Sequence, residues 1–278
     1  MRNFDNIGRL NFFIKDSQKK GVFKMVKEFC TLLFIKKEIP FYYFKYIYKK
    51  NIKNYLDYLS TNEVNAIGNS KILHNSDYKD LLENKLFFAL FSEKCLINTP
   101  RLISYNLGNI FYFGNKNEII YTKKELIVFF KHVFASSNIE AIFFRPPSEY
   151  GGKGCFKLTI KTLITEIDTR YESLVSGCFV HTEVIKQHED INRIHSKSVN
   201  TIRVLSLITA ENTIEIISAF MRFGVGESVV DNVSSGGFFV GINLWDGTLK
   251  SIGFYEQENE GEVYEHPNSG FKLAGFKI

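Results

Sequence analysis

A glycine-rich stretch with one lysine is the first group of residues that could bind a phosphorylated ligand. It consists of Gly151, Gly152, Lys153 and Gly154. Glycine admits backbone dihedrals that aim N–H groups at an anion, and it has no side chain to block the approach. No Ser or Thr follows a Gly-Lys pair and a strand-like segment comes next, so neither the Walker motif nor the dinucleotide fingerprint is present. A simple hairpin turn is the alternative interpretation.

A second group of polar residues interrupts apolar, strand-like segments further along the chain. Its members are Asn200, Arg203, Arg222, Asp231 and Asn232. Side chains alternate between the faces of a strand, so Arg203 shares a face with Thr201 and lies opposite Asn200. A buried arginine is costly unless it is paired, which favours a phosphate or carboxylate facing Arg203. A salt bridge on an exposed strand face is the alternative for either arginine.

The histidines and cysteines give no metal motif. His181, His188 and His195 recur at seven-residue intervals, but no carboxylate or cysteine completes a cluster at ligand spacing. The four cysteines, Cys30, Cys95, Cys155 and Cys178, contain no Cys-x-x-Cys pair. We expect these thiols to be reduced and buried, and we assign no metal ligand within the chain.

The elements that would position these residues follow from apolar periodicity and turn signals. Helical patterns cover residues 20–60, 77–95 and 123–134, and a hairpin covers 109–121. Strands are expected at 101–105, 141–144, 155–160, 179–185, 201–208, 213–223, 237–242 and 248–254. The residue pattern changes near residues 60 and 140. These changes divide the chain into a basic, aromatic helical region at 1–60, an α+β lobe at 61–140 and a second lobe with a central sheet at 141–278.

The composition is that of an ordinary globular protein. Of the 278 residues, 45% are apolar and 23% are charged, which argues against disordered and fibrous classes. No apolar stretch approaches the roughly 18 residues that span a bilayer, and the first residues are polar where a signal peptide would begin. We therefore expect a cytoplasmic protein.

Positive charge is concentrated at the beginning of the chain. Residues 1–53 hold 13 Lys and Arg against 4 Asp and Glu, a balance of +9, whereas the rest hold 22 against 26, a balance of −4. Aromatic residues at 41–48 alternate with Lys45 and Lys49 and continue to Lys50 and Lys53. A peripheral contact with an anionic membrane on the inner membrane face and a nucleic-acid contact both suit this mixture. A helix packed on the body with a solvated lysine face is favoured, and no nucleic-acid partner is expected because no binding motif accompanies the charge.

The order of motifs from residue 75 to 278 resembles the sugar-transfer-associated ATP-grasp family, which is related to α-L-glutamate ligases. The resemblance is carried by several spaced motifs: Asn84-Lys85 with Pro100, Phe144-Arg145-Pro146 with the glycine-rich stretch, Glu183-Val184-Ile185 before Gln187-His188, Ser198 to Arg203, Asp231-Asn232 with Gly236-Gly237, and His266 to Gly270. Several matches in one order are more specific than any single match.

The resemblance implies an α+β fold in which two lobes enclose an ATP cleft, with Mg²⁺ as the metal. Lys153 and the amides of Gly151, Gly152 and Gly154 would cover the phosphates. Arg145 stands where the family usually has a lysine, and it would also contact phosphate. The segment Glu183, Val184 and Ile185 would be the hinge that binds adenine. The remaining site residues, Arg203, Arg222, Asn200, Asp231 and Asn232, would face or order the transferred phosphoryl group.

The activity implied by the resemblance is ATP-dependent ligation of a carboxylate to an amine through an acyl phosphate, acting on a small-molecule or glycan-precursor substrate in bacterial surface-polysaccharide modification. The family continues past the segment at 274–278 into a helix, a strand with an aspartate and a Glu-x-Asn motif that hold magnesium. We therefore expect the C-terminal part of the fold to be missing and the chain to be nearly inactive. Alternatives are an ATP-grasp phosphotransferase and a degenerate nucleotide-binding scaffold.

Overall fold

The computed structural model describes residues 13–149, 151–255 and 261–278. The chain divides into two compact units, Met1–Ser76 with Phe254–Glu262, and Asp77–Gly253 with Val263–Ile278. None of the helices in the described ranges combines the length and hydropathy needed to cross a bilayer.

The first unit is a small helical body with an aromatic core. It contains α2 (Val22–Lys36), the 3-10 turns η1 (Phe41–Phe44) and η2 (Tyr55–Asp57), and α3 (Thr61–Gly68). Leu32, Tyr43, Ile47 and Tyr48 form the buried core. Inside it, Nζ of Lys20 lies 2.7 Å from Oε2 of Glu28, so the buried carboxylate is paired.

The helix expected over residues 20–60 is therefore only partly right. The α2 helix ends where Lys37 adopts a left-handed conformation with φ of 53°. Beyond it, Pro40 precedes a 3-10 turn that places Tyr43 in the core, and Tyr48 joins it there from the segment that follows. Packing of large aromatic side chains decides the backbone here, because they bury far more apolar area than one extra helical turn would gain.

The second unit begins with helices α4 (Ser76–Glu83) and α5 (Lys85–Lys94) and a six-stranded sheet. One continuous helix at 77–95 was expected, but Asn84 divides it, because its side chain accepts hydrogen bonds from the N–H groups of Leu86 and Phe87 and caps α5. The sheet order is β3-β2-β1-β6-β4-β5, and every neighbouring pair is antiparallel. The strands are β1 (Leu102–Leu107), β2 (Ile110–Phe113), β3 (Lys116–Ile119), β4 (Ala141–Arg145), β5 (Phe156–Thr159) and β6 (Cys178–Glu183).

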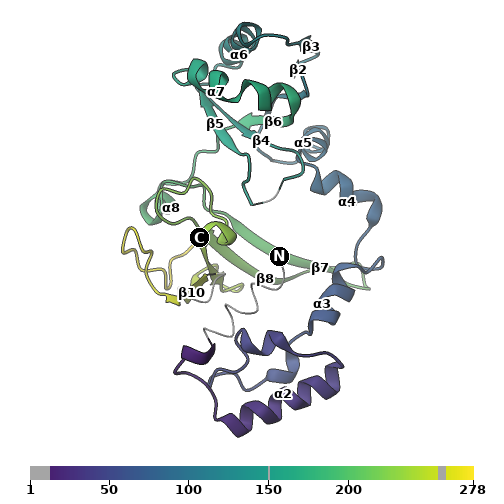
Figure 1. Cartoon of the computed structure of the whole chain (residues 1–278), viewed down its shortest axis with the longest axis vertical. Helices are drawn as coiled ribbons and strands as arrows, with labels where there is room; N and C mark the ends of the chain where they lie inside the picture. Colours follow the sequence, from purple (N-terminus) through teal and green to yellow (C-terminus); the bar gives the residue numbers. More distant parts are fainter. Residues whose placement is uncertain (1–12, 150, 256–260) are drawn as a thin grey trace. The chain divides into compact units, whose positions relative to one another are not determined.

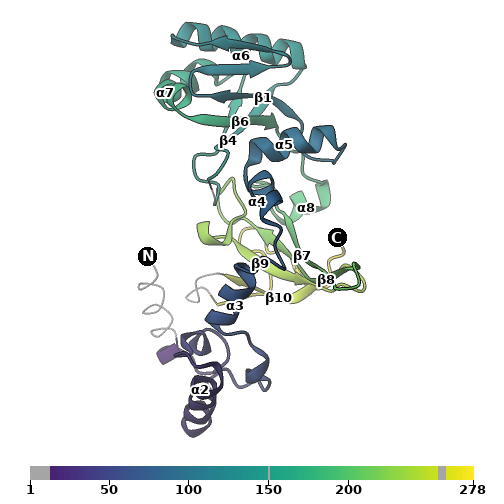
Figure 2. The ribbon, with the colours of Figure 1, turned by 90° about the vertical axis from the view of Figure 1, so that its right-hand side faces the viewer.

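Two helices pack together on this sheet, α6 (Lys123–Ser137) and α7 (Leu163–Ser176) (Figure 1, Figure 2). Their apolar faces and the strands bury one core that includes Phe111, Phe130 and Phe144. The sequence patterns missed α7. His181 on β6 sits in this core, between Ser104 and Asn106, so the three histidines spaced by seven do not share a helix.

A second, five-stranded sheet follows in the order β11-β10-β9-β8-β7. After the short helix α8 (Glu189–Ile194) come β7 (Ile202–Ile208), β8 (Ile214–Phe223), β9 (Phe238–Ile242), β10 (Leu249–Tyr255) and β11 (Glu262–Val263), with the 3-10 turn η3 (Val233–Ser235) before β9. Strand β8 pairs antiparallel with β7 and with β9. The chain is α+β, as expected.

The cysteines are less buried than expected. All four are free thiols, but Cys30, Cys95 and Cys178 are exposed and Cys155 is half-buried. The prediction of buried thiols rested on the average behaviour of cysteine and was wrong for these positions.

Candidate active site

Arg222 and Asp231 form an ion pair at the start of β7. Nη2 of Arg222 lies 3.2 Å from Oδ1 of Asp231, and their side chains are 18% and 7% exposed. Oδ2 of the same carboxylate accepts hydrogen bonds from the backbone N–H of Thr201, at 2.9 Å, and from its hydroxyl. The guanidinium also donates to Thr201 Oγ1 from Nη2, at 2.7 Å, and from Nη1 to Asn232 Oδ1, at 3.3 Å. Four residues from two strands and a loop are thus fixed in one network, which places a cation at a set position.

Asn200 is hydrogen-bonded to residues of the segment 187–198 and to Gly224, which follows β8. Its Nδ2 donates to Gln187 Oε1 at 3.0 Å and to the carbonyl of His195 at 2.8 Å. Its Oδ1 accepts from Ser198 Oγ at 3.0 Å and from the backbone N–H of Gly224 at 3.1 Å. These bonds use both ends of the amide, so Asn200 holds the loops in place and has little capacity left for a ligand.

The glycine-rich loop lies against the segment that carries Asp231 and Asn232. Gly152 has φ of 74°, and a Cβ there would lie 2.8 Å from Cγ1 of Val230 and 3.4 Å from Nδ2 of Asn232. Neither the dihedral nor the close approach is compatible with a side chain. Gly151 faces Ser234, with 3.8 Å between its ideal Cβ position and the serine hydroxyl. The glycine at 152 therefore lets the loop lie close to Val230 and to Asn232, which accepts a hydrogen bond from Arg222, and Lys153 is exposed.

Arg145, at the end of β4, is a second cation beside this loop. Its Nε is buried and has no hydrogen-bond partner, and no carboxylate pairs with it among the described residues. Burial lowers the pKa of Arg145 and that of Lys85, and the positive charge of Arg145 lowers the pKa of Lys85 further. Nζ of Lys85 donates to the carbonyls of Pro147 and Glu149, which lead into the glycine-rich loop. Arg145, a buried cation that pairs with no carboxylate among the described residues, favours an anionic ligand.

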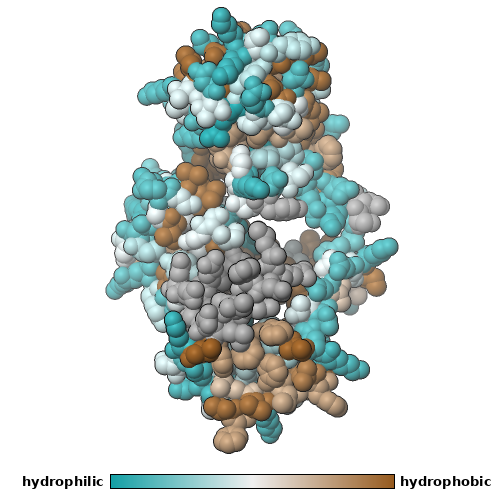
Figure 3. All heavy atoms as spheres, in the orientation of Figure 1, coloured by the Kyte–Doolittle hydropathy of each residue, from teal (hydrophilic) through white to brown (hydrophobic). Residues whose placement is uncertain are grey.

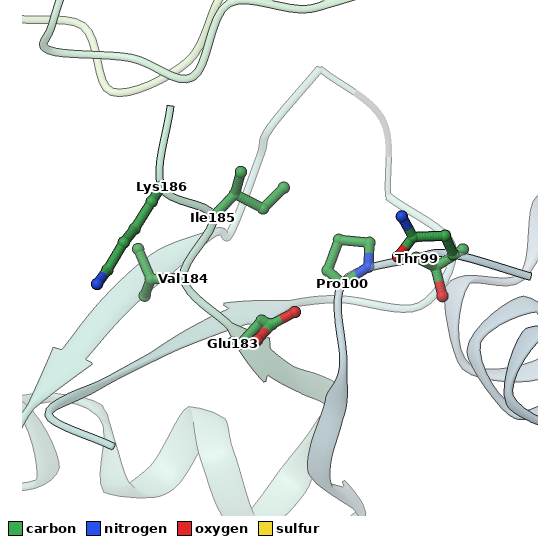
Figure 4. A pocket seen from close by; sticks show the side chains of 7 residues that line it. Thr99, Pro100, Glu183, Val184, Ile185 and Lys186 are labelled. Carbon is green, nitrogen blue, oxygen red and sulfur yellow. The ribbon is translucent and has the colours of Figure 1, made fainter. Parts of the chain in front are cut away.

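An open pocket of about 470 Å³ is lined by residues 183–186, which include the segment expected to be the hinge, and by Asn98, Thr99 and Pro100. Glu183 is fixed by Arg101, whose N–H donates to Oε1 of Glu183 at 2.9 Å and whose carbonyl accepts from the Glu183 N–H at 3.0 Å. Beyond Glu183, the backbone of residues 184–186 makes no hydrogen bond with any described residue. Figure 4 shows Ile185 on the Pro100 side of the segment, with Val184 and Lys186 on the other. The pocket therefore offers free backbone groups beside apolar side chains, which is what a planar heterocycle needs.

Arg203 lies on the same sheet face as Arg222. Its register partner on β8 is Phe220, two residues before Arg222, and side chains opposite one another share a face. Arg203 is exposed, however, and it makes no ion pair or hydrogen bond with the described residues. The predicted alternation of side chains along the strand is confirmed, but the prediction that Arg203 is buried is wrong.

Several residues of the site carried no predicted role. Thr201 links Arg222 to Asp231, and Lys85 supports the glycine-rich loop. His266 is fully buried, and its Nε2 lies 3.0 Å from the carbonyl of Gly224. Burial lowers the pKa of His266 to about 4, so its imidazole is neutral at pH 7. All three residues lie in motifs that carry the family resemblance, but the type of residue at 85 or 201 does not by itself indicate a role.

No group of three or more His, Cys, Asp or Glu side chains comes together as a metal site within the described ranges. Both carboxylate oxygens of Asp231 are engaged by Arg222 and Thr201. The described residues therefore do not fit a magnesium ion on their own.

Comparison with known proteins gives one result. Residues 147–278, the part of the chain that holds the glycine-rich loop and the Arg222–Asp231 pair, match the model of a family described as sugar-transfer associated ATP-grasp. No curated protein and no solved structure matches the chain.

Proposed function

We propose that this chain, whose residues 147–278 match the sugar-transfer associated ATP-grasp family, binds ATP and activates a carboxylate for ligation to an amine. The observation that supports this proposal most strongly is the approach of Gly152 to Val230 and Asn232, because it brings the glycine-rich loop next to a residue that is hydrogen-bonded to Arg222. The carboxylate belongs to a small molecule or a glycan precursor, in keeping with the sugar-transfer association of the family.

The phosphates of ATP would lie between the glycine-rich loop and two cations. Gly151, Gly152 and Gly154 all have positive φ, which turns the loop tightly and exposes its N–H groups. Lys153 adds a mobile charge, and Arg145 adds a guanidinium whose Nε has no protein partner. Guanidinium groups pair with phosphate through two parallel hydrogen bonds, which would satisfy that nitrogen.

Adenine would occupy the pocket at Glu183–Lys186. The edge of the base both donates and accepts hydrogen bonds, and the N–H and C=O groups of residues 184–186 are unused by the described protein. Ile185 and Pro100 would contact the faces of the ring. The carboxylate of Glu183 keeps the segment in place through Arg101 and would not contact the base.

In the proposed reaction, an oxygen of the substrate carboxylate attacks the γ-phosphorus of ATP and ADP leaves. The amine nitrogen then attacks the carbonyl carbon of the acyl phosphate, loses a proton and expels inorganic phosphate, which leaves an amide. Arg222, held by Asp231 and Thr201, would stabilise charge on the transferred phosphoryl group without moving, and fixed charge of this kind lowers the barrier most. Magnesium would neutralise phosphate charge in such a reaction, and the described residues contain no group of three or more His, Cys, Asp or Glu that could hold it.

Hydroxylamine provides a test that needs no knowledge of the natural amine. It traps an acyl phosphate as a hydroxamate, so the chain is incubated with ATP, magnesium, hydroxylamine and a panel of carboxylates that includes acidic sugars. The proposal predicts that hydroxamate and ADP form in equal amounts with at least one acid, which would overturn the expectation of a nearly inactive chain, and that the Arg222→Lys variant forms neither. Formation of a phosphorylated alcohol without hydroxamate would identify a phosphotransferase instead.

A nucleotide-binding scaffold without catalysis is the second candidate. It is favoured by one observation, that Asp231 has no free oxygen for a metal ion. Binding of ATP with no hydroxamate and no ADP from any acid would support it over the ligase.

A further inference from the structure

The outward face of α2 is an apolar surface with no partner among the described residues. Phe23 is 94% exposed and Phe34 is 86% exposed. They are separated by three helical turns and lie opposite Glu28 and Leu32, which α2 buries in its own unit. Val26 and Leu33 extend the same face and are 57% and 41% exposed. In Figure 3, apolar residues gather over the part of the surface where Figure 1 places α2.

The charges around this face are almost all positive. Residues 13–53 contain 11 lysines against Asp16, Glu28 and Glu38, a balance of +8. Lys24 and Lys27 are exposed on α2, and Lys37 is exposed directly after it. None of these three lysines forms an ion pair with a described residue.

The three carboxylates are already counted in this balance, and none of them forms an ion pair with Lys24, Lys27 or Lys37. Glu28 is buried with Lys20, and Glu38 accepts hydrogen bonds from the backbone N–H groups at 61 and 62. Asp16 accepts from the hydroxyl of Tyr48 at 2.7 Å. The three lysines on and beside α2 therefore remain available to an anionic surface outside the protein.

We propose that α2 docks on an anionic lipid membrane, with Phe23 and Phe34 inserted at the boundary of the headgroups. An apolar helix face bordered by lysines is the pattern of helices that lie in the plane of a membrane interface. The apolar residues supply the insertion and the lysines supply the attraction to anionic headgroups. Exposed phenylalanines on one face of a protein also mark interaction surfaces in general, and the excess of lysine selects the lipid surface.

The docking surface differs from the one suggested by the aromatic run at 41–48. Tyr43 and Tyr48 are buried in the core of the unit. Lys45 and Lys49 are half-buried, and each Nζ lies 5.9 Å from the centre of the Tyr46 ring. Only Lys50 and Lys53 of the expected basic face are exposed, so α2 replaces this segment as the membrane contact.

Sedimentation of the whole chain with vesicles tests the proposal. Vesicles of phosphatidylcholine alone are compared with vesicles that contain about 30% phosphatidylglycerol. We expect binding to the anionic vesicles only, at least about tenfold weaker for Phe23→Ser/Phe34→Ser and weakened for Lys24→Gln/Lys27→Gln and by high salt. The matched controls are Ile72→Ser/Trp245→Ser, two residues that are 96% and 86% exposed elsewhere, and Lys71→Gln/Lys116→Gln. The control variants should bind as the original chain does.

A fluorescent reporter on α2 measures membrane insertion directly, so that loss of binding caused by misfolding of a variant can be recognised. Trp245 is the only tryptophan, so Trp245→Phe/Phe34→Trp reports on α2 alone. Its emission should shift to shorter wavelength with anionic vesicles and stay unchanged with neutral ones. Equal binding of both vesicle types, a Phe23→Ser/Phe34→Ser variant that binds normally, or a reporter that does not shift would each overturn the proposal. So would a dimer that this double variant converts to a monomer, because the face would then bind a second copy.

Discussion

The Nη2 atom of Arg222 lies 3.2 Å from Oδ1 of Asp231, at a point where a strand end and a loop are joined through the hydroxyl of Thr201. The pair is largely buried, so each charge depends on the other for solvation. This dependence couples the stability of the second sheet to the geometry of the proposed active site.

Replacement of Asp231 by Ala should strongly destabilise the chain. It leaves Arg222 largely buried without its carboxylate, and breaking such a pair costs roughly 3 kcal/mol in free energy of unfolding. The control Asp246→Ala removes a carboxylate that only closes the turn before Thr248, and it should cost about 1 kcal/mol. Urea unfolding measures both. Equal losses for the two variants would show that the Arg222 pair is not the stabilising contact inferred here.

Gly152→Ala should lower the stability of the chain by more than the cost of placing an alanine at positive φ. An alanine at this φ costs about 1 kcal/mol, and its Cβ would also meet Val230 at 2.8 Å. Gly114 has φ of 58° and nothing within 4 Å, so Gly114→Ala isolates the dihedral cost. Thermal unfolding of both variants and of Gly152→Ala/Val230→Ala gives the comparison. The double variant should recover part of the loss, and no recovery would place the loop away from Val230.

Acid should destabilise the first sheet through His181. Burial among aromatic rings lowers the pKa of His181 to about 3, whereas the unfolded side chain titrates near 6.5. The unfolded state therefore binds more protons between these values, so stability is fully present above pH 6.5 and falls as the pH is lowered, by up to about 1.4 kcal/mol per pH unit. His181→Gln should flatten the pH dependence of urea unfolding. In the original chain, the His181 NMR signals should stay those of the neutral ring at pH 5, and protonation there would contradict this.

Arg203→Ala should separate catalysis from stability. Arg203 is exposed and has no partner among the described residues, so the free energy of unfolding should change by less than about 0.5 kcal/mol. If it acts with Arg222 on the phosphoryl group, formation of ADP should fall at least about tenfold. Arg193→Ala, another exposed arginine, is the control and should leave ADP formation unchanged. A normal rate for Arg203→Ala removes Arg203 from the site.

Much of the second sheet was predictable because its strands are apolar segments separated by turn signals. The face shared by Arg203 and Arg222 follows from alternation once the register of β7 and β8 is known. The glycines at 151–154 were recognisable because their positive φ restricts the residue type. The family match covers the same part of the chain and agrees with the resemblance drawn from its motifs.

The first unit and the supporting contacts were not predictable in the same way. Residues 41–48 have helical spacing, but tertiary packing of Tyr43 and Tyr48 overrides it. Thr201 and Lys85 lie in motifs that carry the family resemblance, but their contacts with the site come from long-range pairing that the sequence does not report. Strand alternation predicts which residues share a face of β7, but it does not predict whether another element covers that face, so the exposure of Arg203 could not be predicted.

Calorimetric titration with a non-hydrolysable ATP analogue tests the central claim, that residues 151–154 and 183–186 form a nucleotide site. Lys153→Ala is compared with Lys157→Ala, which removes an exposed lysine from the neighbouring strand β5. We expect the original chain and Lys157→Ala to bind the analogue with equal affinity and Lys153→Ala to bind at least about fivefold more weakly, as expected for the loss of one charge-assisted contact. No heat of binding at millimolar analogue, or equal affinities for all three proteins, would contradict the assignment.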